Sequence, residues 1–346
     1  MDEAALSRLL DAFAGARIAV VGDFFLDKYL VVDPSIAEVS IETDLEAHQI
    51  VGKRLSPGAA GTVTSNLAAL GVGTIHAVGL IGRDGEGFEL REGLHARGVT
   101  TGFLTEAPDR FTPTYTKPMA VQADGSEVEM NRQDIKNRTR TPEALEDAVI
   151  GDLRRVVPEV DAVIALDQVQ ERNFGVVTDR VRAELATLAR EHTDTVFFGD
   201  ARAHIADFRN IIIKPNAFEA VSAIRPGYSG EPTLDLARDC AEELARRTAR
   251  PLYVTLGPDG ILVFDGKDWS HARTVPAEGP IDIVGAGDST TAGIVSSLCS
   301  GASLHDAALI GNVVASITIQ RIGTTGTASP EEVRARFGRF AAAGMV

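Results

Sequence analysis

Short, wholly apolar runs alternate along most of the chain with stretches whose apolar residues recur every three or four positions. Leu6, Leu9 and Phe13 show the second pattern, which predicts a helix over residues 3–14. The run Ile18–Val21 is apolar at every position, as expected of a strand that is buried on both faces of a parallel sheet. Continued alternation predicts an α/β fold with a central, mostly parallel sheet and helices on both of its faces.

The remaining predicted elements follow one another without a long linker or a repeat, so we predict a single domain over residues 1–346. Helices are predicted from 61 to 70, from 85 to about 97, over 142–157, 174–191 and 233–248, and from about 216 and 288 onward. Strands are predicted at 74–81, 162–166, 195–198, 211–213, 252–255, 260–264 and 281–284.

Two segments, about 28–56 and 112–132, depart from this pattern. They contain short runs of alternating polarity, separated by Pro34, acidic turns and the hairpin signal Asp124-Gly125. Such runs are typical of antiparallel strands. We therefore predict a small antiparallel β lid attached to the main sheet.

Composition and charge exclude several classes of function. The 346 residues carry a formal net charge of −15, which disfavours binding to nucleic acid or to an anionic membrane surface. The sequence has no apolar run long enough to span a membrane, and its first residues, Met1–Glu3, are acidic where a signal peptide is basic. The two cysteines lie far apart and predict no disulfide. We expect a cytoplasmic protein.

The segment Asp282–Ser289 has the strongest chemical signal. A short β-prone stretch leads into Gly285 and Gly287, and a helical pattern follows Asp288 immediately. Glycines at a helix N-terminus expose N–H groups that bind anions, whereas a carboxylate there would repel an anion. The combination suits phosphoryl transfer to a hydroxyl, with Asp288 as the base. The alternative, that Gly287 and Asp288 only turn and cap the helix, is equally compatible with these residues alone.

Other polar residues follow predicted strands and so collect at one edge of the sheet, where α/β proteins place their ligand sites. Asp27 is interpreted as a ligand of substrate hydroxyls, whereas Asp23 is expected to lie in a solvated loop. The others are Asp167, Asp200, Asn216 and the segment Thr255–Gly257.

The spacing of Asn216 and Glu219 has two interpretations. An Asn followed three residues later by a Glu is the pattern of a helix capping box, and this explains the spacing fully. The functional alternative is a pair of oxygen ligands near a hydrated Mg²⁺ ion. Similarly, the loop Thr255–Gly260 is either a plain hairpin connection or a set of N–H groups that bind a nucleotide phosphate. The small-residue segment Pro57–Gly61 predicts a loop that permits close backbone approach.

Six of these segments together resemble the PfkB/ribokinase family of small-molecule kinases, and within it the D-glycero-β-D-manno-heptose 7-phosphate kinases. The resemblance covers about residues 16–328, and the Asp282–Asp288 segment is its most specific part. It implies a ribokinase-like fold and an ATP- and Mg²⁺-dependent transfer of phosphate to a hydroxyl of a sugar or sugar phosphate. The segments are 22–27, 66–71, 112–117, 214–219, 255–260 and 282–288.

The same resemblance implies a role for each matching residue. On the catalytic side these are Asp288 as the base and the N–H groups of Gly285, Ala286 and Gly287 as the anion hole. On the substrate side they are Asp27, Gly58, Ala59, Thr62 and Lys117. On the ATP side they are Asn216 and Glu219, which order Mg²⁺ through water, with Thr255, Gly257, Gly260 and, near the adenine, Asn312. The surroundings of Asp282 and the loop Gly323–Ala328 would hold a monovalent cation such as K⁺.

The chain departs from the family pattern on the substrate side. The usual Gly-Gly and Asn are replaced by Gly58-Ala59 and Thr62, and Pro118 and Met119 stand where heptose kinases tend to carry an Arg. Two alternatives therefore remain: a regulatory protein of this fold that binds a sugar or nucleotide without catalysis, and a nucleoside kinase. The exposed edge of the predicted lid also suggests a homodimer formed through the lids.

Overall fold

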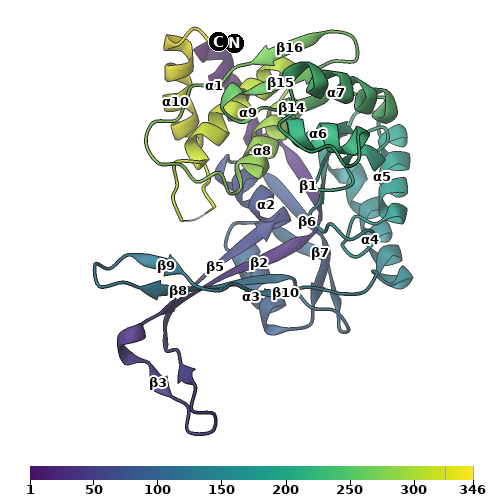
Figure 1. Cartoon of the computed structure of the whole chain (residues 1–346). Helices are drawn as coiled ribbons and strands as arrows, with labels where there is room; N and C mark the ends of the chain where they lie inside the picture. The colour runs from purple at the N-terminus through teal and green to yellow at the C-terminus, as the bar shows by residue number, and fades with distance from the viewer. Residues whose placement is uncertain (324, 346) are drawn as a thin grey trace.

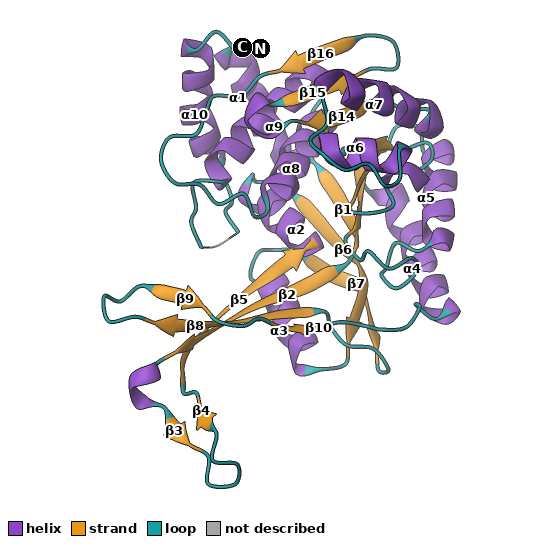
Figure 2. Ribbon diagram, in the orientation of Figure 1, coloured by secondary structure: helices purple, strands orange, loops and turns teal. Residues whose placement is uncertain are grey.

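The computed structural model describes residues 1–323 and 325–345 of the chain. Within these residues, nine strands form one sheet in the order β16-β15-β14-β13-β12-β11-β1-β6-β7 (Figures 1 and 2). All neighbours from β14 to β7 pair in parallel, and only β15 and β16 are antiparallel additions at one edge. The strands are β1 Arg17–Gly22, β6 Thr74–Gly82, β7 Thr100–Ala107, β11 Ala162–Asp167, β12 Val196–Ala201, β13 Ile212–Ile213, β14 Leu252–Thr255, β15 Ile261–Phe264 and β16 Trp269–Ala272.

Helices cover both faces of this sheet, as the sequence pattern predicts. One face packs against α1 Glu3–Ala12, α2 Ala60–Ala69, α3 Gly85–His95, α8 Ala286–Cys299, α9 Leu304–Thr318 and α10 Pro330–Ala342. The other face packs against α4 Glu143–Val156, α5 Asp179–Glu191, α6 Ala217–Ile224 and α7 Leu234–Thr248.

The central strand β1 shows why its sequence is apolar throughout. Ile18 and Val20 lie in the core beneath the first set of helices, whereas Ala19 and Val21 lie in the core beneath the second set. Successive side chains of a strand point to opposite faces, so a strand covered on both sides needs an apolar residue at every position.

A second, smaller sheet lies beside the carboxyl ends of the main strands (Figure 2). Its strands are ordered β10-β8-β2-β5, with β9 paired to β8. This sheet corresponds to the predicted lid, although one of its pairings, between β2 and β8, is parallel. The strands are β2 Phe24–Val32, β5 Ile50–Ala59, β8 Thr114–Val121, β9 Glu127–Glu129 and β10 Gln133–Ile135.

The segment between β2 and β5 forms an arm that projects from the lid (Figure 1). It contains the two-stranded pair β3 Glu38–Val39 and β4 Glu46–Ala47. The apolar side chains of Val39, Ile41 and Leu45 are 68%, 97% and 68% exposed. The arm therefore presents apolar surface away from the body of the molecule.

Several predicted boundaries were wrong for identifiable reasons. Residues 281–284 form no strand, because they lie in an exposed loop rather than beside a sheet edge. Pro57–Ala59, predicted as a loop, end strand β5, and Phe24–Asp27 begin strand β2. Helix α5 begins at Asp179 rather than 174. Strand β7 and helices α9 and α10 were not predicted.

Among the described residues, no helix combines the length and the apolar character that a membrane span requires.

Candidate active site

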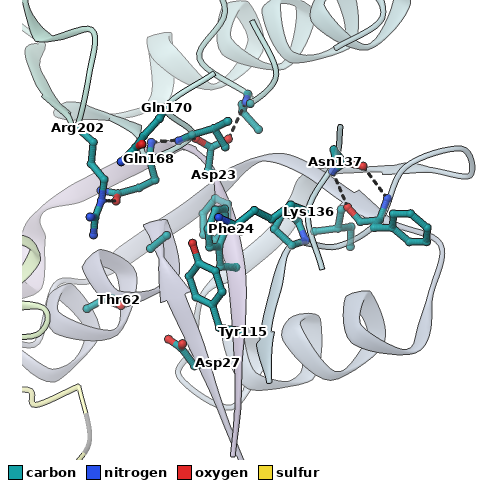
Figure 3. Close-up of a pocket in the computed structure, with 18 of the residues that line it drawn as sticks. Asp23, Phe24, Asp27, Thr62, Tyr115, Lys136, Asn137, Gln168, Gln170 and Arg202 are labelled. Atoms are coloured by element: carbon teal, nitrogen blue, oxygen red, sulfur yellow. Dashed lines mark hydrogen bonds between the residues drawn. The ribbon is translucent and has the colours of Figure 1, made fainter. Parts of the chain in front are cut away.

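A cavity of about 600 Å³ lies between the lid and the carboxyl edge of the main sheet. Asp27 and Asp288, which are 261 positions apart in the sequence, both line it. Its walls include β2, β8 and the loop after β11 (Figure 3). The N-terminus of α8 also lines it. The other predicted site residues that line it are Ala59, Thr62, Lys117 and Gly285. The structure therefore brings the predicted base and most of the predicted substrate side together.

Helix α8 begins at the cavity with two glycines, one of which is required by the geometry. Gly285 is the N-cap residue, with φ of 80°, and a Cβ at this position would lie 2.6 Å from Cγ2 of Thr325. Asp288 is the third helical residue. Among the described residues, no acceptor lies within hydrogen-bonding distance of the N–H groups of Gly285 and Gly287. The N–H of Ala286 instead donates to the carbonyl of Ile283 at 3.1 Å, so two of the three predicted anion-hole donors are free.

Asp288 is half-buried, and its electrostatic surroundings suit a general base. Burial raises the pKa of Asp288 to about 7, and the nearby Asp200 contributes to this rise. Lys214 and Arg202 act in the opposite direction and favour the charged form. A carboxylate with a pKa near neutrality accepts a proton readily, and about half of it is still ionised at neutral pH.

A buried ion pair lies directly beneath this helix terminus. Nζ of Lys214 is 2.8 Å from Oδ2 of Asp200, and the two side chains are only 4% and 12% exposed. Thr291 of α8 donates to the same carboxylate at 3.2 Å. A Cβ placed on Gly287 would lie 3.6 Å from Nζ of Lys214, so the ammonium group faces the N-terminus of α8. Burial opposes the charge, but Asp200, Glu219 and Asp288 hold the pKa of Lys214 above its usual range.

No role was predicted for Lys214, although it is the first residue of the segment 214–219, which contains the predicted Mg²⁺-ordering residue Asn216. The available signal was its position at the end of a predicted strand, the same criterion that selected Asp200. What the sequence did not reveal is that the two strands, β12 and β13, are neighbours.

Asn216 and Glu219 form a capping box at the start of α6. The N–H of Glu219 donates to Oδ1 of Asn216, and the N–H of Asn216 donates to Oε2 of Glu219, both at 2.8 Å. Burial, assisted by Asp200, raises the pKa of Glu219. The capping interpretation is therefore realised, and it is compatible with a Mg²⁺ role because this ion usually keeps several waters and takes few protein ligands. No cluster of three or more metal-binding side chains occurs in the described part of the chain.

The other predicted ATP-side residues lie beside this box rather than in the cavity. Thr255, at the end of β14, forms a parallel bridge with Asn216. Gly257 adopts a φ of 58°, and a Cβ on it would meet no other atom within 4 Å. A Cβ on Gly260 would lie 2.3 Å from the carbonyl of Ala272. Nδ2 of the buried Asn312 donates to that same carbonyl at 2.8 Å, so its amide fixes the end of β16.

On the substrate side, Asp27 and Lys117 are neighbours on adjacent lid strands. Nζ of Lys117 lies 3.2 Å from Oδ1 of Asp27 and donates to the hydroxyl of Tyr29 at 3.1 Å. A Cβ on Gly58, which pairs with Phe25 in the facing strand, would lie 2.4 Å from Oδ2 of Asp27. Gly58 therefore leaves room for the carboxylate rather than contacting the cavity itself.

Ala59 occupies a backbone conformation that an L-residue rarely adopts. Its φ is 52° and its ψ is −117°, and it stands between the end of β5 and the start of α2. Such a conformation costs about 1–3 kcal/mol for a residue with a Cβ. Ala59 lines the cavity, so the surrounding structure holds a residue of the cavity wall in an unfavourable backbone state.

Replacing Ala59 by glycine should raise the free energy of unfolding by about 1 kcal/mol, because relief of strain exceeds the entropy lost by glycine. Urea unfolding followed by circular dichroism would measure this change. Ala60→Gly is the matched control: Ala60 begins α2 with ordinary helical geometry, so it should lower stability. Destabilisation by Ala59→Gly would contradict the strain argument.

Asp23 does not lie in a solvated loop, as expected, but is buried with 3% exposure. Its carboxylate accepts hydrogen bonds from the N–H groups of Gln168 at 3.0 Å, Val169 at 3.2 Å and Val176 at 2.7 Å (Figure 3). A Cβ on Gly175 would lie 2.6 Å from its Oδ1. Asp23 thus holds both ends of the loop that forms one cavity wall, and this contact explains why α5 does not begin at 174.

Asp167 belongs to the interior rather than to the cavity. Burial, assisted by the charge of Asp23, raises the pKa of Asp167 to about 7, and Arg182 contacts its Oδ2 at 2.9 Å. Asp167 is the last residue of β11 rather than the first residue after it, and its side chain stabilises the junction of β11 and α5.

The carboxylate of Asp282 connects two loops. It accepts hydrogen bonds from the N–H groups of Val284 at 3.0 Å and Gly323 at 3.3 Å. Both carboxylate oxygens of Asp282 therefore accept hydrogen bonds from backbone N–H groups. Main-chain carbonyl oxygens are then the candidate ligands of the predicted monovalent cation. Thr324, part of the implicated loop, lies outside the described residues.

Solved structures of known proteins share the fold of this chain. The fold is similar to Arabidopsis thaliana ribokinase, complexed with ribose and ATP (TM-score 0.68, 19% identity, 93% of this chain and 98% of that one). It is also similar to phosphofructokinase-2 from Escherichia coli (TM-score 0.69, 18% identity, 94% and 99%).

Sequence relatives include bifunctional proteins HldE from Hyphomonas neptunium and Desulfatibacillum aliphaticivorans, at 30% and 28% identity over 95% and 94% of this chain. The chain spans 65% and 63% of the length of these relatives. The family model for pfkB family carbohydrate kinases matches residues 17–332. The chain therefore belongs to the pfkB family of carbohydrate kinases.

Proposed function

We propose that the protein is an ATP-dependent kinase that phosphorylates a hydroxyl of a sugar or sugar phosphate. The observation that carries this proposal is the shared cavity of Asp27 and Asp288, together with two N–H groups at the start of α8 that make no hydrogen bond to any described residue. One carboxylate lies on the lid and the other at the sheet edge. A hydroxylated molecule held by Asp27 would thus present a hydroxyl to Asp288 at a site built for an anion.

In the proposed reaction, Asp288 takes the proton of the acceptor hydroxyl. The acceptor oxygen forms a bond to the γ-phosphorus as the bond to the β,γ-bridging oxygen breaks and ADP leaves. The N–H groups of Gly285 and Gly287 and the ammonium of Lys214 stabilise the negative charge of the transferring group. Glu219, with Asn216, would hold Mg²⁺ through water; when bound, this ion neutralises phosphate charge.

Ala59 and Thr62, which depart from the family pattern, both line the cavity. One experiment therefore tests the kinase proposal against the two alternatives, a regulatory protein and a nucleoside kinase. A panel of sugars, sugar phosphates and nucleosides would be incubated with Mg²⁺ and ATP, and ADP release measured. Release of ADP with a sugar or sugar phosphate would support the proposal. Heptose 7-phosphate should be tested first, because the sequence resembles heptose 7-phosphate kinases. Binding without turnover would support the regulatory alternative, and release only with nucleosides would overturn the acceptor class.

The pKa of Asp288 sets the expected pH dependence. The base must be ionised, so kcat/KM should rise about tenfold per pH unit below pH 7 and level off above it. A pH profile between 5 and 9 would show this limb, and the residual activity of Asp288→Asn should lack it. A flat wild-type profile across pH 7 would contradict the assignment of this base.

We also propose that the lids of two copies pair, because the arm exposes Val39, Ile41 and Leu45 with nothing from its own chain to cover them among the described residues. Light scattering at micromolar concentration should give twice the chain mass of 36.7 kDa. Ile41→Asp should give the monomer, because a charge would enter an apolar contact. A monomeric wild type would count against the dimer.

A further inference from the structure

The cavity contains three arginines, and they differ in what their guanidinium groups contact. Arg110 donates to the carbonyls of Thr139, Arg140 and Phe174, so it is committed to the backbone. Arg132 pairs with Asp134 through Nε at 2.7 Å and Nη2 at 2.9 Å. Both groups therefore stabilise the walls of the cavity.

Arg202 is different, because only its Nε is engaged. Nε donates to Oε1 of Gln168 at 2.7 Å, and among the described residues no acceptor lies within hydrogen-bonding distance of Nη1 or Nη2. Figure 3 shows the Gln168 side chain between Arg202 and Asp23. The terminal nitrogens, with four N–H bonds, are thus fixed in direction and make no hydrogen bond to any described residue.

The support for this orientation extends into the core. Gln168 is held through its N–H by the buried carboxylate of Asp23 at 3.0 Å, and the N–H of Arg202 donates to the carbonyl of Asp167 at 3.1 Å. Both ends of the Gln168–Arg202 contact are therefore fixed to neighbouring strands, β11 and β12. A side chain held in this way is pre-organised, and little entropy is lost when it binds an anion.

The charge of Arg202 acts on groups at both ends of the reaction path. Although burial and Asp200 raise the pKa values of Asp288 and Glu219, Arg202 favours the ionised form of both. It acts in the same direction on Tyr115 of the lid, whose pKa burial and Asp134 raise. Arg202 also lines the same cavity as Asp288 and Tyr115, the place where a phosphoryl group would be transferred.

We propose that Arg202 is a catalytic residue whose free Nη groups donate hydrogen bonds to the γ-phosphoryl group as it moves from ADP to the acceptor oxygen. This inference rests on the proposed kinase function. The proton still passes from the acceptor hydroxyl to Asp288. Arg202 supplies charge-assisted hydrogen bonds to equatorial oxygens that become more negative in the transition state. Gln168 is a positioning residue, because it acts only through Arg202.

Arg202→Gln should lower kcat by about 100-fold or more with little change in the KM for ATP. The ascending limb of the pH profile should move to higher pH, because a charge that favours ionised Asp288 is lost. The affinity for ADP with aluminium fluoride, a mimic of the transferring group, should fall by a similar factor, whereas the affinity for ADP alone should not. Arg202→Lys should preserve the pH limb while kcat stays reduced, because the charge remains without the planar fork.

Three further variants sharpen the test. Gln168→Ala should lower kcat by about 10-fold, and Gln168→Glu should retain activity, because a carboxylate also holds Nε. Arg246→Gln removes an arginine that is 70% exposed on α7 and should change nothing. A kcat within twofold of the wild type for Arg202→Gln, or a rise only in the acceptor KM, would overturn the inference. If the wild type releases no ADP with any acceptor, the proposed function itself fails.

Discussion

Replacing Asp288 by asparagine should lower kcat by about 10³-fold and leave the affinity for ATP nearly unchanged. The amide cannot take the acceptor proton at neutral pH, and general-base catalysis contributes about 10²–10⁴ to the rate. The fold should be kept, because asparagine has the same shape and relieves the desolvation that raises the pKa of Asp288 to about 7. Turnover would be measured by ADP release, and ATP binding by calorimetry.

The chain offers a matched control for this substitution. Asp306 is the third residue of α9, as Asp288 is of α8, and its Oδ2 accepts a hydrogen bond at 2.8 Å from the hydroxyl of Ser303, the N-cap residue of that helix. Asp306→Asn therefore makes the same chemical change at the same helical position outside the cavity. It should leave kcat unchanged and lower stability slightly. Normal phosphorylation by Asp288→Asn would show that another group accepts the proton.

The N-terminus of helix α8 could be predicted from sequence because its signal is local. Gly285, Gly287 and Asp288 lie within four residues of one another. The glycine at position 285 is required by its own backbone conformation, with φ of 80°. The apolar run Ile18–Val21 likewise predicted a strand covered on both faces, since each of its residues meets one of the two cores.

What could not be predicted depends on contacts between distant segments. Asp23 appears as a loop residue in the sequence, yet it bonds Gln168 and Val176, which are 145 and 153 positions away. The same contact keeps residues 174–178 out of helix α5, which was predicted to begin at 174 and begins at Asp179. The sequence shows Ala59 where the family usually has a glycine, but it does not show the strain, because the positive φ of Ala59 arises where β5 of the lid meets helix α2.

The second large effect is expected at Lys214, whose ammonium group is buried against Asp200 below the free N–H groups of α8. Lys214→Met should lower kcat by about 100-fold or more, because a fixed positive charge near the transferring group is lost. It should also destabilise the fold by about 3–5 kcal/mol, since the Asp200 carboxylate is left buried without its partner. Steady-state kinetics and urea unfolding would measure the two effects separately.

A double variant separates catalysis from folding at this position. Asp200→Asn combined with Lys214→Met removes both charges, so no unpaired carboxylate remains and most of the lost stability should return. Activity should not return, because the phosphoryl group still lacks the ammonium charge. The asparagine also keeps an oxygen for the hydrogen bond from Thr291, which preserves the packing of α8 on β12. Recovery of both stability and turnover in the double variant would mean that Lys214 serves only to neutralise Asp200.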